Sequence, residues 1–122
     1  MKLFLLLGSA LMFVGVGAGA FGAHALADLL KETGRADTYE TAVRYQMYHA
    51  LALLAVAWLS TQIQSGLVSW AGWLFFVGVL IFSGSLYLLI FTGRTWLGAI
   101  TPIGGVAFLA GWVCLFVAVL RS

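Results

Sequence analysis

The sequence predicts an all-α membrane protein: a four-span antiparallel bundle of transmembrane helices, with a short amphipathic surface helix after the first span. Hydrophobic residues make up 63% of its 122 residues and charged residues only 8%, whereas a soluble domain has about 25% charged residues. The charges also leave three long gaps, at 3–27, 45–93 and 95–120. One span needs about 20 apolar residues. The outer gaps therefore hold one span each, and the middle gap holds two.

The first span is expected at about 3–23, within a single domain covering 1–122. It ends near an A-x-A sequence that resembles a signal-peptidase site, but its apolar run is longer than the roughly 7–15 residues of a signal peptide. We therefore expect it to be retained. Small residues four apart, including Gly15 and Gly19, with Gly22 in a second pair, predict a surface for close helix packing. Gly8 lies outside this spacing and is expected to tolerate a larger side chain.

The hydrophilic loop 24–44 follows and contains all four acidic residues. Its leucines fall on one side of a helix and its charges on the other, which predicts a short amphipathic helix on the membrane surface that ends at Gly34. Asp37, with Glu40 three residues later, resembles a capping box that opens the second span, expected at about 38–61.

The last two spans are expected at about 68–91 and 98–120. Pro102 fits the first turn of the fourth span, and Thr101 is expected to cap it. Gly104 and Gly105 give this span a second small packing surface.

The count of basic residues predicts the orientation. With four spans, Lys2 and Arg121 lie on one side of the membrane. The other side carries twice as many basic residues, namely Lys31, Arg35, Arg44 and Arg94. Cytoplasmic loops are enriched in Lys and Arg. The loop 24–44 is therefore predicted to face the cytoplasm.

Polar side chains from every span gather in the half of the membrane that adjoins this loop. His49 lies about 7–8 Å deeper than Arg44 at 1.5 Å per residue. An ionisable group at such a depth faces the interior and takes a partner. We expect a neutral His49 bonded to Ser83, to Ser85 or to a carbonyl near Gly84. The candidate cluster consists of His24, Tyr45, Gln46, His49, Ser83, Ser85, Tyr87 and Thr101.

Two interpretations of this cluster remain open. Its members either form interhelical hydrogen bonds that fix the bundle, or line a pocket or path for a lipid headgroup, a proton or a small solute. A bis-histidine haem site at His24 and His49 has no further support in the sequence, and a zinc site lacks a third ligand. We expect no cofactor, no metal, no enzymatic activity and no nucleic-acid partner. The expected partners are membrane lipid, a second copy of the chain or another membrane protein.

Four motifs carry a resemblance to a known family. "GAFGAHAL", "AVRYQMYHALALL", "FSGSLYLLIFTG" and "LGAITPIGGVAFLAGW" resemble the signatures of domain-of-unknown-function family 423, small bacterial membrane proteins related to transmembrane protein 256. The resemblance implies a four-span protein of the bacterial cell (inner) membrane without an assigned activity. It implies no catalytic or binding residues, although His24 and His49 fall inside its motifs. The function expected is a membrane-embedded binding or assembly scaffold, and the alternative is a conduit for protons or a small solute through the His49 region.

Overall fold

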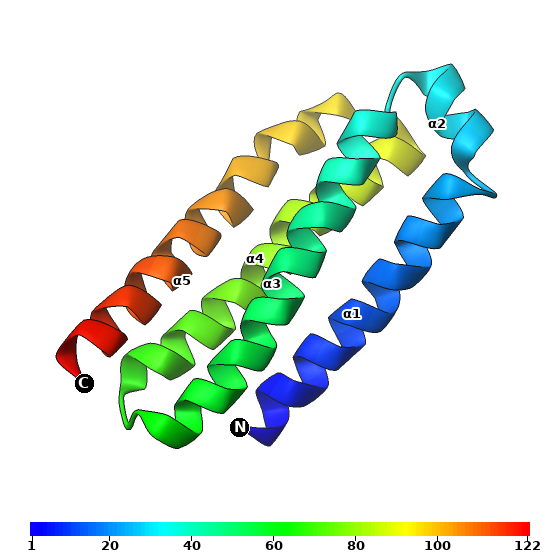
Figure 1. The fold of residues 1–122 in the computed structure, drawn as a ribbon. Helices are drawn as coiled ribbons and strands as arrows, with labels where there is room; N and C mark the ends of the chain where they lie inside the picture. The colour runs from blue at the N-terminus through cyan, green and yellow to red at the C-terminus, as the bar shows by residue number, and fades with distance from the viewer.

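The computed structural model describes all 122 residues and is helical throughout, without strands. Four long helices alternate in direction and lie side by side (Figure 1). Both chain termini and the α3–α4 turn lie at one end of the molecule, the termini end. Helix α2 and the 3-10 helix η1 lie at the other, the loop end. The all-α prediction is confirmed. The elements are α1 (Lys2–Ala23), α2 (Ala27–Thr33), α3 (Ala36–Gln62), α4 (Gly66–Thr92), η1 (Thr95–Ala99) and α5 (Thr101–Arg121).

Three segments are long and apolar enough to cross a membrane: α1, α4, and η1 together with α5. Helix α3 has 27 residues and a length of about 40 Å, so it is long enough, but it is not among the three. Its first third carries Asp37, Glu40 and Arg44, and Gln46 and His49 follow. These residues lower its hydropathy.

Two of the predicted helix starts differ in detail. Helix α3 begins one residue before Asp37, with Arg35 at its N-cap position and no side-chain cap. Asp37 is thus already in the first turn, where its charge favours the helix N-terminus, and Glu40 pairs with Arg44 instead. Helix α5 follows η1 through Ile100, whose backbone is already helical, and Thr101 is the first residue of α5. Thr101 therefore does not take the N-cap position, which requires a non-helical backbone.

The helices pack in chain order, α1 against α3, α3 against α4 and α4 against α5. Glycines seven residues apart, Gly8, Gly15 and Gly22, form the face of α1 that touches α3. A side chain at these positions would meet Leu54, Met47 and Tyr39 respectively. Seven residues are close to two helical turns, so the three glycines lie on one face.

This arrangement corrects the prediction for Gly8. A Cβ atom there would lie 3.0 Å from the Ala50 carbonyl oxygen, so Gly8 is a packing residue. Gly19, by contrast, would place a Cβ at an ordinary 3.7 Å from Val43. A four-residue spacing does not identify the packing face here, because the partner helix follows the seven-residue period.

Helices α4 and α5 pack by opposing phenylalanine rings and glycines. Gly111 lies against Phe75 of α4, and Gly78 of α4 lies against Phe108 of α5. At the loop end a Cβ on Gly104 would lie 2.5 Å from the main-chain nitrogen of Phe82, so the main chains of α4 and α5 approach closely there. The predicted role of Gly105 is not found, since it faces open space.

Candidate functional site

Gln46 joins three helices on the side of α3 that faces α1. Its Nε2 donates to the Leu11 carbonyl of α1 over 2.8 Å, and the Tyr87 hydroxyl of α4 donates to its Oε1 over 2.7 Å. The side chain is 2% exposed. Gly15 lies close by, where a Cβ would be 3.4 Å from the amide nitrogen and would clash with Met47 Sδ. A buried amide with both ends bonded holds its neighbours at a fixed depth.

Two further hydroxyls on this side also bond to main-chain carbonyls of neighbouring helices. The Tyr39 hydroxyl donates to Ala18 of α1. Ser83 Oγ of α4 donates to Ala42 of α3 over 2.6 Å. Each of these carbonyl oxygens accepts the hydroxyl in addition to its hydrogen bond within the helix. Such an interhelical bond contributes about 0.6–2 kcal/mol in a membrane protein.

His49 faces α5, on the other side of α3. Its Nδ1 lies 2.8 Å from the Tyr45 carbonyl oxygen, and Trp112 Nε1 donates to its Nε2 over 3.0 Å. An indole N–H only donates, so Nε2 is the acceptor and Nδ1 carries the proton. These bonds assign the neutral tautomer. The imidazole stacks on Phe108 with centroids 3.6 Å apart, and Phe75 lies 5.4 Å away.

The prediction that His49 bonds to Ser83, to Ser85 or to a carbonyl near Gly84 is wrong, since its partners are the Tyr45 carbonyl and Trp112. Ser83 bonds on the α1 side, and Ser85 bonds to Thr101 and to the Phe82 carbonyl. The depth of His49 was deduced from its distance along the helix, but depth does not say which neighbour a side chain faces. The partner that was not predicted is Trp112, which is 45% exposed and whose indole N–H finds its acceptor on His49.

The remaining predicted residues are divided among separate places. Tyr45 lies beside His49 and is 39% exposed. His24 is exposed at the end of α1 and makes no side-chain hydrogen bond. Helix α1 packs on α3, while His49 turns toward α5. The predicted cluster is therefore divided: Gln46 bonds to Tyr87, Ser85 bonds to Thr101, and Ser83 bonds to the Ala42 carbonyl. His49 bonds to Trp112, which was not predicted, and His24 stands apart.

No buried side-chain nitrogen or oxygen lacks a hydrogen-bond partner. No three His, Cys, Asp or Glu side chains lie together as a metal site would require. Both nitrogens of His49 are used by the protein itself. The polar groups are thus arranged to join helices to one another.

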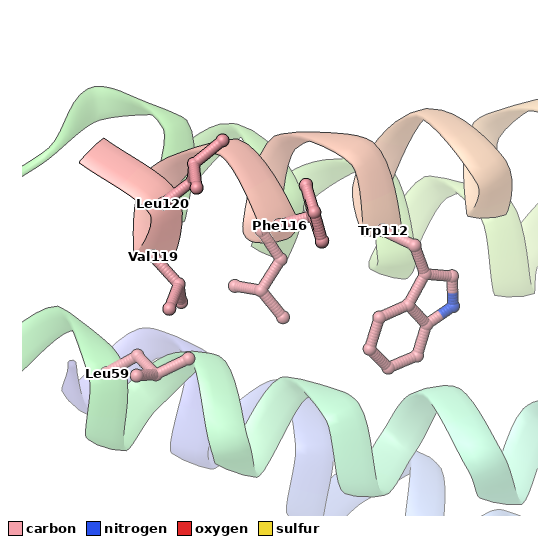
Figure 2. A pocket seen from close by; sticks show the side chains of 6 residues that line it. Leu59, Trp112, Phe116, Val119 and Leu120 are labelled. Atoms are coloured by element: carbon pink, nitrogen blue, oxygen red, sulfur yellow. The ribbon is translucent and has the colours of Figure 1, made fainter. Parts of the chain in front are cut away.

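A cavity between α3 and α5 at the termini end shares only Trp112 with these groups (Figure 2). This α3–α5 groove has a volume of about 540 Å³. This groove was not predicted from the sequence. Apolar residues of α5 spaced at i, i+3, i+4 and i+7 form one wall, but the same spacing is typical of a helix face that packs against a neighbour. The groove is lined by Leu59, Trp112, Leu115, Phe116, Val119 and Leu120.

Two smaller cavities open at the loop end and share no residue with the groove. One of about 290 Å³ lies beneath α2, beside Tyr39 and Glu40. The other, of about 300 Å³, lies between α3, α4 and the start of α5, beside Asp37 and Thr101.

Comparison with known proteins identifies the family. The family model described as protein of unknown function (DUF423) matches residues 18–105. The chain is 48% identical to a UPF0382 membrane protein of Staphylococcus haemolyticus and 49% identical to one of Staphylococcus epidermidis, in each case over 99% of this chain and 98% of the relative. It is 46% identical to the UPF0382 membrane protein YwdK of Bacillus subtilis, with the same coverage. No solved structure matches.

The chain therefore belongs to the DUF423 family, as its four motifs predicted. Its relatives are named membrane proteins of bacteria, and three of its helices have the length and apolarity of spans. The predicted location in a bacterial membrane is confirmed, and the inner membrane is consistent with these matches.

Proposed function

We propose that this DUF423 protein spans the membrane four times, with α2 on the membrane surface, and serves as a membrane-embedded binding or assembly scaffold. One observation carries the proposal: the buried polar side chains are bonded within the chain. A scaffold needs fixed helices, whereas a conduit needs polar groups free to meet a solute. We assign no catalytic activity to the chain.

The fourth span in this proposal is α3. Its low hydropathy comes partly from Gln46 and His49, which are 2% and 4% exposed and hydrogen-bonded. Lipid meets neither of them. No charge follows Arg44 until Arg94. Because α3 lies between α1 and α4 along their length (Figure 1), a membrane that both neighbours cross also surrounds α3.

The alternative function, a conduit through the His49 region, needs a polar path to both surfaces. From His49 toward the termini end the interior consists of aliphatic and aromatic side chains, including Leu53, Val56 and Phe75. The loop-end cavities and the α3–α5 groove share no lining residue. A charged or strongly hydrated solute would have to cross this hydrocarbon layer, which is costly. These features support the scaffold.

A cysteine-labelling experiment tests the four-span arrangement. Glu32→Cys in α2 and Gln64→Cys in the α3–α4 turn are both exposed, and Cys114→Ala removes the single native thiol. A membrane-impermeant maleimide should label Gln64→Cys in intact cells and label Glu32→Cys only after lysis, since the basic loop end faces the cytoplasm. Labelling of both positions from the same side would show that α3 does not span. Opposite labelling with Glu32→Cys outside would keep the four spans and reverse the orientation.

A flux experiment separates the scaffold from the conduit. Wild type, His49→Gln and His49→Leu are reconstituted in liposomes with an internal pH dye, and their melting is measured in parallel. We expect no proton flux above that of protein-free vesicles, and a lower melting temperature for Leu than for Gln, because only Gln retains an acceptor for Trp112. Fast wild-type flux, abolished by both substitutions with unchanged melting, would establish the conduit instead, since an amide does not titrate near neutral pH.

A further inference from the structure

We propose that the α3–α5 groove binds one acyl chain of a phospholipid from the leaflet at the termini end, with the lipid phosphate beside Arg121. The inference deepens the proposed function, on which it rests for the position of α3 in the membrane. It identifies membrane lipid as the partner and the groove as its site.

The length of the groove matches one leaflet. It extends along α5 from Trp112 to Leu120, which is about 12 Å at 1.5 Å per residue. Half of a bilayer's hydrocarbon core is about 15 Å thick. All six lining residues are hydrophobic, so the groove offers van der Waals contacts and no hydrogen bonds. An acyl chain is matched by both the length and the chemistry of this site.

The width of the groove favours an acyl chain over a helix. A volume of about 540 Å³ over about 12 Å of length gives a mean cross-section of about 45 Å². A helix with its side chains is about 10–12 Å across and needs about 80–110 Å². A second copy of this chain, or a helix of another protein, would cover the groove without filling it. A lipid chain is thin and flexible enough to enter.

Trp112 closes the inner end of the groove. Figure 2 shows its indole reaching from α5 toward α3, while Val119 and Leu59 approach one another near the other end. The hydrogen bond from Trp112 Nε1 to His49 and its ring contact with Phe75, at 4.6 Å between centroids, fix the indole. His49 is thus a positioning residue for the wall against which the end of the acyl chain would stop.

One of the two basic residues of the termini end, Arg121, is adjacent in sequence to the last residue that lines the groove. Arg121 follows Leu120 directly, and both are exposed. Lys2 is the other formal side-chain charge at this end. A guanidinium at the level of the headgroups attracts a phosphate and forms bidentate hydrogen bonds with it. An acyl chain seated in the groove therefore places its own headgroup near a suitable cation.

The test measures lipid binding by native mass spectrometry of delipidated protein in detergent, titrated with palmitoyl-oleoyl phosphatidylglycerol. Val119→Phe fills the groove. Val113→Phe makes the same change on α5 at a residue that is 61% exposed and outside the groove. Wild type and Val113→Phe should bind one lipid with equal affinity. Val119→Phe should bind the lipid about tenfold more weakly, because the groove and the medium around the protein are both apolar and packing contacts therefore carry the binding. Its melting temperature should equal that of wild type.

The charge is tested with Arg121→Gln against Lys2→Gln. Arg121→Gln should weaken phosphatidylglycerol binding about fivefold at most, since a single basic residue near the membrane surface adds only a modest attraction for an anionic lipid. Lys2→Gln should weaken phosphatidylglycerol binding less than Arg121→Gln does. The affinity for uncharged diacylglycerol should change less in either variant. Equal weakening by both variants would remove Arg121 from the site.

Equal lipid binding by Val119→Phe and Val113→Phe, or no lipid retained by wild type, would overturn the proposal. A wild-type dimer that Val119→Phe dissociates would assign the groove to a second copy and overturn it as well. These results are distinct from failure of the four-span proposal. If Glu32→Cys and Gln64→Cys label from one side, the proposed function fails. If they label from opposite sides while lipid binding is unchanged by Val119→Phe, only the groove proposal fails.

Discussion

The two sides of α3 hold their neighbours by different means. On the α1 side, glycines on α1 bring the two helices together. Tyr39 and Ser83 bond to main-chain carbonyls across the interfaces, and Gln46 bonds to a carbonyl and to Tyr87. On the α5 side no glycine brings α5 against α3. His49 instead bridges the gap by a side-chain hydrogen bond to Trp112 and by stacking on Phe108.

The difference shows that glycine placement decides which helices touch. Gly104 and Gly111 turn α5 toward α4, where Phe82 and Phe75 lie against them. The space between α3 and α5 is then filled only where rings meet, around His49. Toward the termini end no such ring bridges the gap, and the α3–α5 groove remains. A close-packed interface fixes two helices, and a ring-bridged one leaves a cavity beside it.

The largest effect should come from placing a side chain in the α1–α3 contact. Gly8→Leu would drive a side chain into Leu54 and the Ala50 carbonyl, which lie 2.9 and 3.0 Å from the new Cβ. The main chain of α3 cannot move aside locally, so we expect a loss of about 3 kcal/mol, at the upper end of overpacking costs. The measurement is the melting temperature and unfolding free energy in detergent.

Gly17→Leu is the matched control on the same helix, because nothing lies within 4 Å of its new Cβ. Its free energy of unfolding should lie within about 0.5 kcal/mol of the wild-type value, after correction for the higher helix propensity of Leu. Equal losses for Gly8→Leu and Gly17→Leu would mean that α1 does not pack on α3 by this face.

A smaller effect should separate the two polar sites. Gln46→Leu removes bonds to two other helices and leaves the half-buried Tyr87 hydroxyl without an acceptor. We expect a loss of about 2 kcal/mol. His49→Leu removes one interhelical bond and leaves the Trp112 indole unpaired, while Leu still packs on Phe108. We expect about 1 kcal/mol there.

Unfolding in detergent measures both substitutions, and the emission wavelength of the tryptophans reports on the His49 site. His49→Leu should shift the emission, since Trp112 loses its acceptor, whereas Gln46→Leu should leave it unchanged. A larger loss of stability for His49→Leu than for Gln46→Leu would reverse the comparison and make the ring-bridged side the stronger one.

Some features follow from the sequence because they depend on neighbouring residues alone. The charge-free gaps place the apolar helices, and Gly34 ends α2 with a positive φ of 69° as predicted. The concentration of polar residues near the loop end follows from position along each helix. Gln46 and His49 are buried, as an amide and an imidazole inside a membrane protein are expected to be.

Other features depend on how each helix is rotated about its axis. Gln46 and His49 are three residues apart, which places them only about 60° from one another around α3. That small angle is nevertheless enough for their side chains to bond to α1 and α5 respectively. The same rotation brings Gly8 into contact and leaves Gly105 open.

The sequence by itself thus determined the helices, their apolar character and the depth of the polar residues, because each is set by local composition and by 1.5 Å of rise per residue. Only the tertiary structure decided the partner of His49, the seven-residue contact of α1 with α3 and the groove beside α5. Each of these requires two helices to be placed against one another, and many rotations bury similar apolar surface. Contacts as close as those of Gly8 and Gly104 select one of them.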